Sequence, residues 1–184
     1  HIVDDHLMET YPVIRGPEWI SSLPKHVQLT EAFGWQPLIY AHIPVILGSD
    51  KSKLSKRHGA KPASEYRQDG FLPEAILNYM AFLGWTPKSG KEILSLDEMI
   101  EEFDLKDVHV TSPVFDITKL TWMNGEYVRK FKIQNLKFKI LEYLKLLAGG
   151  EMPDHPTDEE IEKVLPLVQT RIKTLADFIP LTEF

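Results

Sequence analysis

Residues 48–59 read Gly48-Ser-Asp-Lys-Ser-Lys-Leu-Ser-Lys-Arg-His-Gly59, a cationic loop with glycine at both ends. The apolar run of residues 42–47 precedes it, so we expect the loop to follow a buried strand. Lysine is a compact point charge and arginine binds two oxygens at once. The loop therefore suits a polyphosphate whose negative charge grows as a leaving group departs. For a bare Lys-x-Ser-Lys pattern a solvated surface loop is the more common interpretation, so the flanking sequence has to decide.

The sequence before the loop predicts a parallel α/β sheet. Residues 1–15 alternate polar and apolar side chains and are rich in strand formers, so we expect strand there. A helix is expected to begin at Pro24 and to end at Gly34. The next strand covers residues 42–47. Strand, helix, strand and phosphate loop is the order of a parallel α/β sheet, whose ligands lie beyond the carboxyl ends of its strands.

The sequence after Pro62 has helical periodicity instead. Pro73 fits the first position of a helix and Gly84 fits its end. Asp116 is expected to cap a short helix that breaks at Asn124-Gly125, where two turn-forming residues meet. The chain is therefore expected to be α/β at its start and mostly α beyond.

Two helices carry the signature of a reciprocal N-terminal cap. Ser95 with Glu98, and Thr157 with Glu160, have the spacing of a capping box. Pro166 is expected to divide the last helical stretch. Helical spacing of apolar residues predicts the faces that pack in the core. These residues are Ile76, Met80, Leu83, Leu96, Met99, Ile100, Phe103, Leu136, Ile140, Leu144 and Leu147.

The composition is that of an acidic globular chain without cysteine. The 184 residues carry a net charge of −6 and are 43% hydrophobic, enough for a core in one domain or two small ones. Basic residues gather in residues 51–67 and 129–139, and such local clusters, rather than net charge, make an electrostatic footprint for RNA. Solvated surface faces are an alternative of equal weight. Without cysteine or a histidine motif, no protein-bound metal is expected. Without a signal peptide or an apolar span, we expect a cytoplasmic protein that makes no membrane contact.

The segment Lys53-Leu-Ser-Lys-Arg57 resembles the KMSKS signature of class I aminoacyl-tRNA synthetases, in the form found in the bacterial-type glutamyl branch. Other stretches resemble that family in the same order and at its spacing, over residues 1–150 and more loosely to the end. They are Val3-Asp-Asp-His-Leu-Met8, Val13-Ile-Arg-Gly-Pro-Glu-Trp19, Ser22-Leu-Pro-Lys-His26, Glu31-Ala-Phe-Gly-Trp35, Gly70-Phe-Leu-Pro-Glu-Ala-Ile-Leu-Asn-Tyr79, Leu83-Gly-Trp85, Phe115-Asp116 and Lys119-Leu-Thr-Trp-Met-Asn124.

The resemblance implies an internal piece of a longer synthetase, because the HIGH motif of the family does not occur here. Residues 1–62 would be the C-terminal half of a Rossmann-like catalytic domain. Residues 63–132 would form a helical stem-contact domain, and residues 133–184 the start of a helical anticodon-binding domain. We expect this piece alone to be inactive, its parent to be a monomer, and residues 1–62 to expose apolar surface and strand edges that favour self-association.

The resemblance also implies roles for individual residues in glutamyl-adenylate formation from ATP and L-glutamate, with Mg²⁺ accompanying the ATP. Lys56 would steady the phosphates as pyrophosphate leaves, assisted by Lys53 and Ser55. Arg15 would bind the substrate glutamate, with a structural salt bridge as its alternative. The other residues of the ATP site would be Leu54, Arg57, Glu18 and Trp19.

The same resemblance implies contacts with tRNA, presumed to be the glutamate acceptor. The residues in the stem-contact region would be Trp122, Asn124, Tyr127, Arg129, Lys130 and Lys132. Core packing is the alternative for the aromatic members. Two alternatives remain for the whole protein: a glutaminyl or non-discriminating relative, and a synthetase-derived RNA-binding protein that has lost catalysis.

Overall fold

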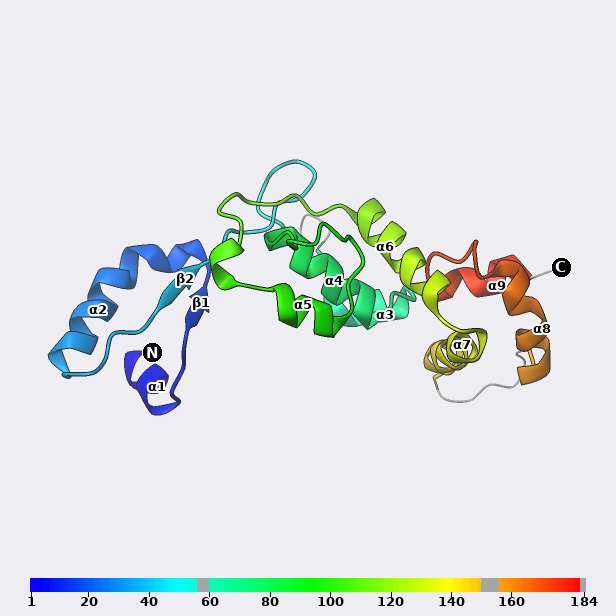
Figure 1. The fold of residues 1–184 in the computed structure, drawn as a ribbon, viewed down its shortest axis with the longest axis horizontal. Helices are drawn as coiled ribbons and strands as arrows, with labels where there is room; N and C mark the ends of the chain where they lie inside the picture. Colours follow the sequence, from blue (N-terminus) through cyan, green and yellow to red (C-terminus); the bar gives the residue numbers. More distant parts are fainter. Residues whose placement is uncertain (56–59, 150–155, 183–184) are drawn as a thin grey trace.

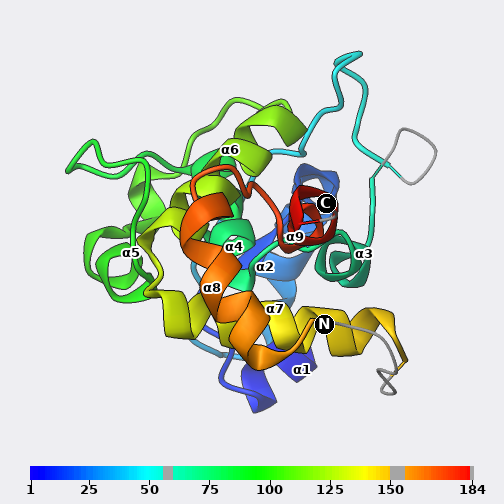
Figure 2. The ribbon, with the colours of Figure 1, turned by 90° about the vertical axis from the view of Figure 1, so that its right-hand side faces the viewer.

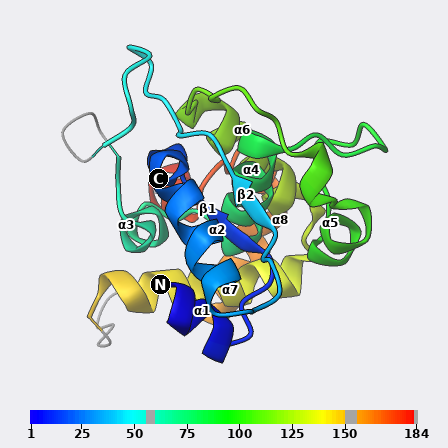
Figure 3. The ribbon, with the colours of Figure 1, turned by 90° about the vertical axis from the view of Figure 1, so that its left-hand side faces the viewer.

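The computed structural model describes residues 1–55, 60–149 and 156–182. Those residues form an extended, mostly helical molecule with one small parallel sheet (Figure 1). The sheet lies near one end with α1 and α2, while α3 to α6 occupy the middle and α7 to α9 the opposite end. Seen from one end of the molecule, α7 and α8 lie toward the viewer (Figure 2). Seen from the opposite end, α1 and α2 lie toward the viewer (Figure 3).

The N-terminal part has a two-stranded sheet whose strands are joined by helix. The strands run parallel, with Val13 opposite Tyr40 and Arg15 opposite His42. Helix α2 ends as expected before Gly34, whose φ of +69° suits glycine. The elements are α1 (Ile2–Leu7), β1 (Val13–Arg15), the 3-10 helix η1 (Pro17–Ser22), α2 (Leu23–Ala32) and β2 (Tyr40–His42).

Two strand predictions in this part are wrong. The first half of residues 1–15 is helix α1, not strand, and the acidic Asp4 and Asp5 in its first turn suit the positive end of a helix. The second strand ends at His42, before Pro44, instead of covering residues 42–47. Proline has no N–H to continue a ladder, so the chain leaves the sheet there.

The middle part is helical, as expected. The helix from Pro73 to Gly84 is confirmed. The capping box is also confirmed, because the Glu98 N–H donates to Ser95 Oγ at 3.2 Å and the Ser95 N–H donates to Glu98 Oε2 at 2.8 Å. The elements are α3 (Ala63–Gln68), α4 (Pro73–Gly84), α5 (Leu96–Glu102), the 3-10 helix η3 (Leu105–Asp107) and α6 (Ile117–Lys130).

The predicted core face of α4 is confirmed at Ile76 and Leu83, which are partly buried against the core, and wrong at Met80, while most of the predicted stripe around α5 is exposed. In α4 the buried residues are Ala75, Asn78 and Tyr79, while Met80 is exposed. Asn78 faces inward because its Oδ1 accepts hydrogen bonds from the Leu94 N–H and the Tyr127 hydroxyl. In α5 only Met99 of the predicted stripe is buried. A polar residue that makes buried hydrogen bonds therefore joins the buried face of α4, which the apolar pattern alone does not predict.

Helix α6 does not break at Asn124-Gly125 but continues to Lys130. Asn124 lies in the middle of the helix and is fully buried. Its Oδ1 accepts from the Leu72 N–H at 2.8 Å, and its Nδ2 donates to the Lys173 carbonyl. Both ends of the amide are engaged by other segments, so the side chain stabilises tertiary packing instead of starting a turn. The expected cap at Asp116 is confirmed.

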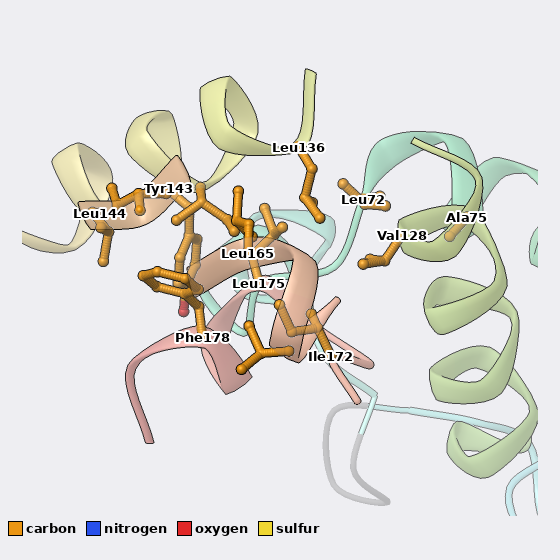
Figure 4. Packing of buried hydrophobic residues seen from close by; sticks show 13 residues of the cluster. Leu72, Ala75, Val128, Leu136, Tyr143, Leu144, Leu165, Ile172, Leu175 and Phe178 are labelled. Carbon is orange, nitrogen blue, oxygen red and sulfur yellow. The ribbon is translucent and has the colours of Figure 1, made fainter. Parts of the chain in front are cut away.

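The C-terminal part packs three helices around one core (Figure 4). The predicted stripe of α7 is buried at Leu136, Ile140 and Leu144, whereas its last member, Leu147, is 51% exposed at the end of the helix. The predicted capping box of Thr157 is confirmed. Pro166 does not divide the helix, because the buried residues around it hold the helix together by packing. The elements are α7 (Ile133–Leu147), α8 (Asp158–Val168), the 3-10 helix η4 (Leu175–Asp177) and α9 (Phe178–Thr182).

This core crosses the boundary predicted between residues 132 and 133. Leu72 and Val128 belong to the same buried cluster as Leu136, Leu165 and Phe178 (Figure 4). The Leu175 N–H also donates to the Gly70 carbonyl at 2.9 Å. Helices α4, α6, α7 and α8 are therefore joined by one continuous core.

The N-terminal part has little core of its own. Within residues 1–55 the buried residues are Ile2, Thr30 and Gly48. Leu7 and Met8 are 73% and 77% exposed. This exposed apolar surface is what the sequence predicts for residues 1–62, and self-association stays a prediction.

Candidate functional site

Arg15 lies at the centre of a group of aromatic and imidazole side chains, which we call the Arg15 cluster. The parallel register sets Arg15 opposite His42, and Arg15 Nε donates to His42 Nε2 at 3.1 Å. Arg15 Nη1 lies 2.9 Å from Nδ1 of His26, which α2 supplies. The Cζ atom lies 4.7 Å from the ring centroid of Tyr40 and 5.6 Å from that of Trp19. Four side chains from the three elements β2, α2 and η1 thus converge on one guanidinium.

The geometry fixes the protonation of both histidines. An arginine carries donors only, so each imidazole nitrogen that it contacts must offer a lone pair. His26 is therefore neutral with its proton on Nε2, and His42 is neutral with its proton on Nδ1. Burial lowers the pKa of His26 and the positive charge of Arg15 lowers it further, in agreement with a neutral ring.

Two buried polar atoms of the Arg15 cluster have no hydrogen-bond partner among the residues that the structure describes. They are Arg15 Nη2 and the hydroxyl oxygen of Tyr40. No ion pair joins Arg15 to a described carboxylate either, so the alternative of a structural salt bridge finds no support there. A buried donor left unpaired costs about 1–3 kcal/mol. Guanidinium N–H groups bind carboxylates best, so the cluster is a candidate carboxylate site.

The residues after Arg15 form the wall of this cluster. Trp19 is half-buried in η1 and contributes its ring, as described above. Glu18 is exposed, and its carboxylate folds over Gly16 so closely that a Cβ there would lie 2.3 Å from Glu18 Oε2. The absence of a side chain at residue 16 leaves room for this carboxylate. The predicted contacts of Glu18 and Trp19 with ATP stay predictions.

The cationic loop begins in a tight turn. Asp50 Oδ1 accepts from the Ser52 N–H at 3.0 Å, and the Gly48 N–H donates to the Ser52 carbonyl at 2.9 Å. Lys53 is exposed, while Leu54 and Ser55 are half-buried. The Leu54 N–H donates to the Ile46 carbonyl at 2.8 Å. Lys56 and Arg57, the other predicted phosphate contacts, lie outside the described residues.

The base of this loop is attached to the segment that precedes α6. Leu47 forms an antiparallel bridge with Lys53 and a parallel bridge with Val114. The Leu47 N–H donates to the Pro113 carbonyl, and the Phe115 N–H donates to the Leu47 carbonyl, both at 2.8 Å. The cationic loop is thus joined by backbone hydrogen bonds to the start of the helix that carries the predicted tRNA contacts.

Two of the six predicted tRNA contacts form hydrogen bonds within the protein. Asn124 is fully buried and both ends of its amide are engaged, so it is a structural residue. The hydroxyl of Tyr127, which has one proton to donate, lies within hydrogen-bond distance of two acceptors, Asn78 Oδ1 and the Leu94 carbonyl. Burial raises the pKa of Tyr127 to about 12. These contacts agree with packing, the alternative expected for this tyrosine.

The other four predicted tRNA contacts lie on the surface. Trp122 is 38% exposed, and Lys119 Nζ lies 4.5 Å from its ring centroid. Arg129 is exposed and forms an ion pair with Glu126. Lys130 and Lys132 are exposed beyond it. Contact of these residues with tRNA remains a prediction.

Other features do not coincide with the predicted site. A mostly apolar cavity of about 690 Å³ lies between α4 and α7, and Arg67, Met80 and Tyr143 are among its lining residues. None of the predicted site residues lines it. In the part of the chain that the structure describes, no three His, Asp or Glu side chains gather as metal ligands, and no helix is long and apolar enough to cross a membrane.

Comparison with known proteins identifies the class. The family model of class I tRNA synthetases (E and Q), catalytic domain, matches residues 1–122. The chain therefore belongs to the class I tRNA synthetase family for glutamate and glutamine.

The relatives with similar sequences and structures are glutamate–tRNA ligases. Those of Dehalococcoides mccartyi and Herpetosiphon aurantiacus are 42% and 43% identical to this chain over 183 and 186 residues. Each match covers 100% of this chain, but only 38% and 37% of the relative. A crystal structure of a glutamate tRNA ligase from Elizabethkingia meningosepticum in complex with its amino acid has a TM-score of 0.83 and 36% identity. That match covers 97% of this chain and 38% of the solved one. The chain thus spans less than two fifths of the length of these relatives.

Proposed function

We propose that this chain carries part of the active site of a glutamate–tRNA ligase. The reaction joins L-glutamate to tRNA with ATP, through a glutamyl-adenylate, and releases AMP and pyrophosphate. In this reaction the α-carboxylate of glutamate attacks the α-phosphorus of ATP, so no general base is needed. The protein has to hold a dicarboxylate and steady the phosphates.

The observation that carries this proposal is the buried Nη2 of Arg15, which has no partner among the described residues. A substrate carboxylate would supply the missing acceptor through a charge-assisted hydrogen bond. The position agrees with the fold, because Arg15 ends a strand of a parallel sheet and ligands bind beyond such ends. The names of the relatives, all glutamate–tRNA ligases, support glutamate as the substrate.

The cationic loop would act on the phosphates of ATP. Lys53 is exposed at its start, where a lysine can reach a phosphate. Lys56 would be the main electrostatic contact as pyrophosphate leaves, with Ser55 and Arg57 beside it. Mg²⁺ would accompany ATP through the phosphate oxygens and water, as this ion usually does. Glu18 and Trp19 would contact the adenosine.

Helix α6 and the residues after it would contact tRNA. Trp122, Arg129, Lys130 and Lys132 are exposed there, and phosphate contacts from such cations position RNA without reading its sequence. Within this proposal, residues 1–62 belong to the catalytic domain, residues 63–132 to the stem-contact domain and residues 133–184 to the anticodon-binding domain. The protein would work as a cytoplasmic monomer.

Charging of total tRNA with glutamate by the complete gene product tests this proposal, with the wild type beside Lys56→Ala and Arg15→Ala. Loss of one preorganised electrostatic contact at Lys56 should lower kcat by about 10²–10³-fold. Arg15→Ala should mainly raise the KM for glutamate. Lys25→Ala, an exposed lysine of α2 outside the cluster, is the matched control.

Two outcomes would favour an alternative. Charging with glutamine in place of glutamate would indicate the glutaminyl branch. Binding of tRNA without any charging by the wild type would indicate an RNA-binding protein that has lost catalysis.

A further inference from the structure

The Arg15 cluster contains two residues whose role the proposed reaction does not explain. His26 and His42 come from different elements, the helix α2 and the strand β2, and meet only at Arg15. Together they engage Nε and Nη1, two of the three guanidinium nitrogens. With two nitrogens held by different elements, the plane of the guanidinium cannot turn about its long side chain. Nη2 is the remaining nitrogen, and it is the buried atom without a described partner.

The chemistry of imidazole suits this task better than that of a carboxylate. An aspartate or glutamate at either position would also accept from Arg15, but its negative charge would neutralise the guanidinium. It would then compete with the carboxylate of the substrate. A neutral imidazole accepts a hydrogen bond and leaves the whole positive charge available.

We propose that His26 and His42 are positioning residues, which hold Arg15 so that Nη2 faces the carboxylate of the substrate. This inference rests on the proposed function, because the substrate carboxylate is that of glutamate. Tyr40 and Trp19 support the same orientation through their rings, at 4.7 and 5.6 Å from Arg15 Cζ.

The arrangement works only while both rings are neutral. Protonating either imidazole replaces the acceptor with a donor and sets a second cation beside Arg15. The titratable and charged groups that face His26 are the Arg15 guanidinium, the carboxylate of Asp5, and the amino group and the imidazole ring of His1. Arg15 is also the group that faces His42 among the residues described. Because burial and the charge of Arg15 lower the pKa of His26 from its usual value of 6.5, binding of glutamate should weaken only on acidification below that value.

Steady-state charging by the complete gene product, with glutamate and ATP varied separately, tests this role. His26→Leu and His42→Leu remove the acceptors and should each raise the KM for glutamate about tenfold to a hundredfold, with the KM for ATP unchanged. His26→Asn and His42→Gln place an amide oxygen near the lost ring nitrogen and should restore most of the affinity. His109→Asn, at an exposed histidine that contacts Thr86, is the control.

The pH profile separates positioning from a merely structural role. In the wild type the KM for glutamate should stay constant from about pH 7.5 to 6.5 and should rise as the pH falls further. In the double variant His26→Asn with His42→Gln this rise should be lost, because an amide does not titrate. A double variant that keeps the wild-type pH dependence, or leucine variants that leave the KM for glutamate unchanged, would overturn the proposal.

The tautomers give a readout that needs no activity. In ¹⁵N-labelled protein at pH 7.5, the imidazole nitrogens should show His26 protonated on Nε2 and His42 on Nδ1. The opposite tautomer or an imidazolium at either residue would overturn the proposal even if a leucine variant failed to fold. Should the wild type charge no tRNA with glutamate, the proposed function fails, while the tautomers still decide the arrangement around Arg15.

Discussion

The backbones of Leu47 and Phe115 are hydrogen-bonded, with the Phe115 N–H donating to the Leu47 carbonyl at 2.8 Å. Phe115 lies 68 residues after Leu47 in the sequence. The ring of Phe115 packs edge-on against Tyr79, with centroids 5.4 Å apart. The base of the cationic loop is therefore held by a residue whose side chain belongs to the helical part.

Phe115→Ala should loosen the base of the loop. We expect a loss of about 2–3 kcal/mol in the free energy of unfolding, less than for a fully buried phenylalanine, because Phe115 is half-buried. Hydrogen exchange of the Leu47 amide, which donates to the Pro113 carbonyl, should become faster. Val114→Ala, at a 45% exposed side chain, is the control and should change little. An unchanged exchange rate of Leu47 in Phe115→Ala would show that the ring does not hold the loop.

Asn124→Leu should destabilise the helical part strongly. The change leaves the Leu72 N–H and the Lys173 carbonyl without partners inside the core. At about 1–3 kcal/mol for each group, the free energy of unfolding should fall by about 2–6 kcal/mol. Urea unfolding measures it, with Asn135→Leu, at an exposed position of α7, as the control expected within about 0.5 kcal/mol of wild type. Equal effects of the two substitutions would contradict the buried role.

Gly70→Ala and Gly90→Ala separate steric collision from backbone strain. Both glycines have a positive φ, +79° and +69°. A Cβ at residue 70 would lie 2.5 Å from the Ala176 backbone nitrogen, whereas nothing lies within 4 Å of a Cβ at residue 90. Gly90→Ala should cost about 1 kcal/mol, and Gly70→Ala clearly more. Thermal unfolding of both variants checks the order, and a reversed order would show that the turn at Gly70 opens easily.

The capping box of α5 should make the stability of that helix depend on acid. The hydrogen bond from Lys91 and that from the Ser95 backbone lower the pKa of Glu98 to about 2. Because this pKa lies below the unfolded value of 4.5, the contribution is full above about pH 4.5 and is lost as the pH falls toward 2. Titration of the Glu98 carboxyl by NMR checks the value. Lys91→Met should raise this pKa; no change would remove Lys91 as the main cause.

Tyr127 should make the stability of the protein fall at alkaline pH, whereas Glu98 makes it fall in acid. Burial raises its pKa to about 12 from a usual value of 10.0. The folded protein therefore keeps the phenolic proton between pH 10 and 12, so stability is full below pH 10 and falls as the pH rises to 12. Absorbance of the tyrosinate in the wild type and in Tyr127→Phe identifies the group. A Tyr127 that ionises near pH 10 would mean that its hydroxyl reaches water.

Local signals in the sequence are sufficient to predict a helix end where a single residue determines the backbone conformation. The helix from Pro73 to Gly84 and the caps at Ser95 and Thr157 follow from proline, glycine and capping chemistry, which act within one turn. The predictions that fail, at Asn124-Gly125 and Pro166, are those in which tertiary contacts override a local turn or break signal.

The candidate site was predictable only in part. The resemblance to the family predicts Arg15, but no pattern in the sequence indicates that His26 and His42 contact it. Their meeting depends on the parallel register of β1 and β2 and on the placement of α2, which no local pattern encodes. The register also sets Tyr40 at the start of β2, where its ring reaches Arg15.

The length of α6 has a consequence for how its two ends work together. The helix begins at the base of the cationic loop and ends at Lys130 after 14 residues, about 20 Å along its axis. Each residue advances a helix by about 100°, so deleting one would turn Arg129 and Lys130 by more than a quarter of a circle relative to the loop. An insertion of seven residues would return them to nearly the same side, about 10 Å further away. The length of helix α6 thus sets both the distance and the angle between the cationic loop and the basic residues in the last turn of the helix.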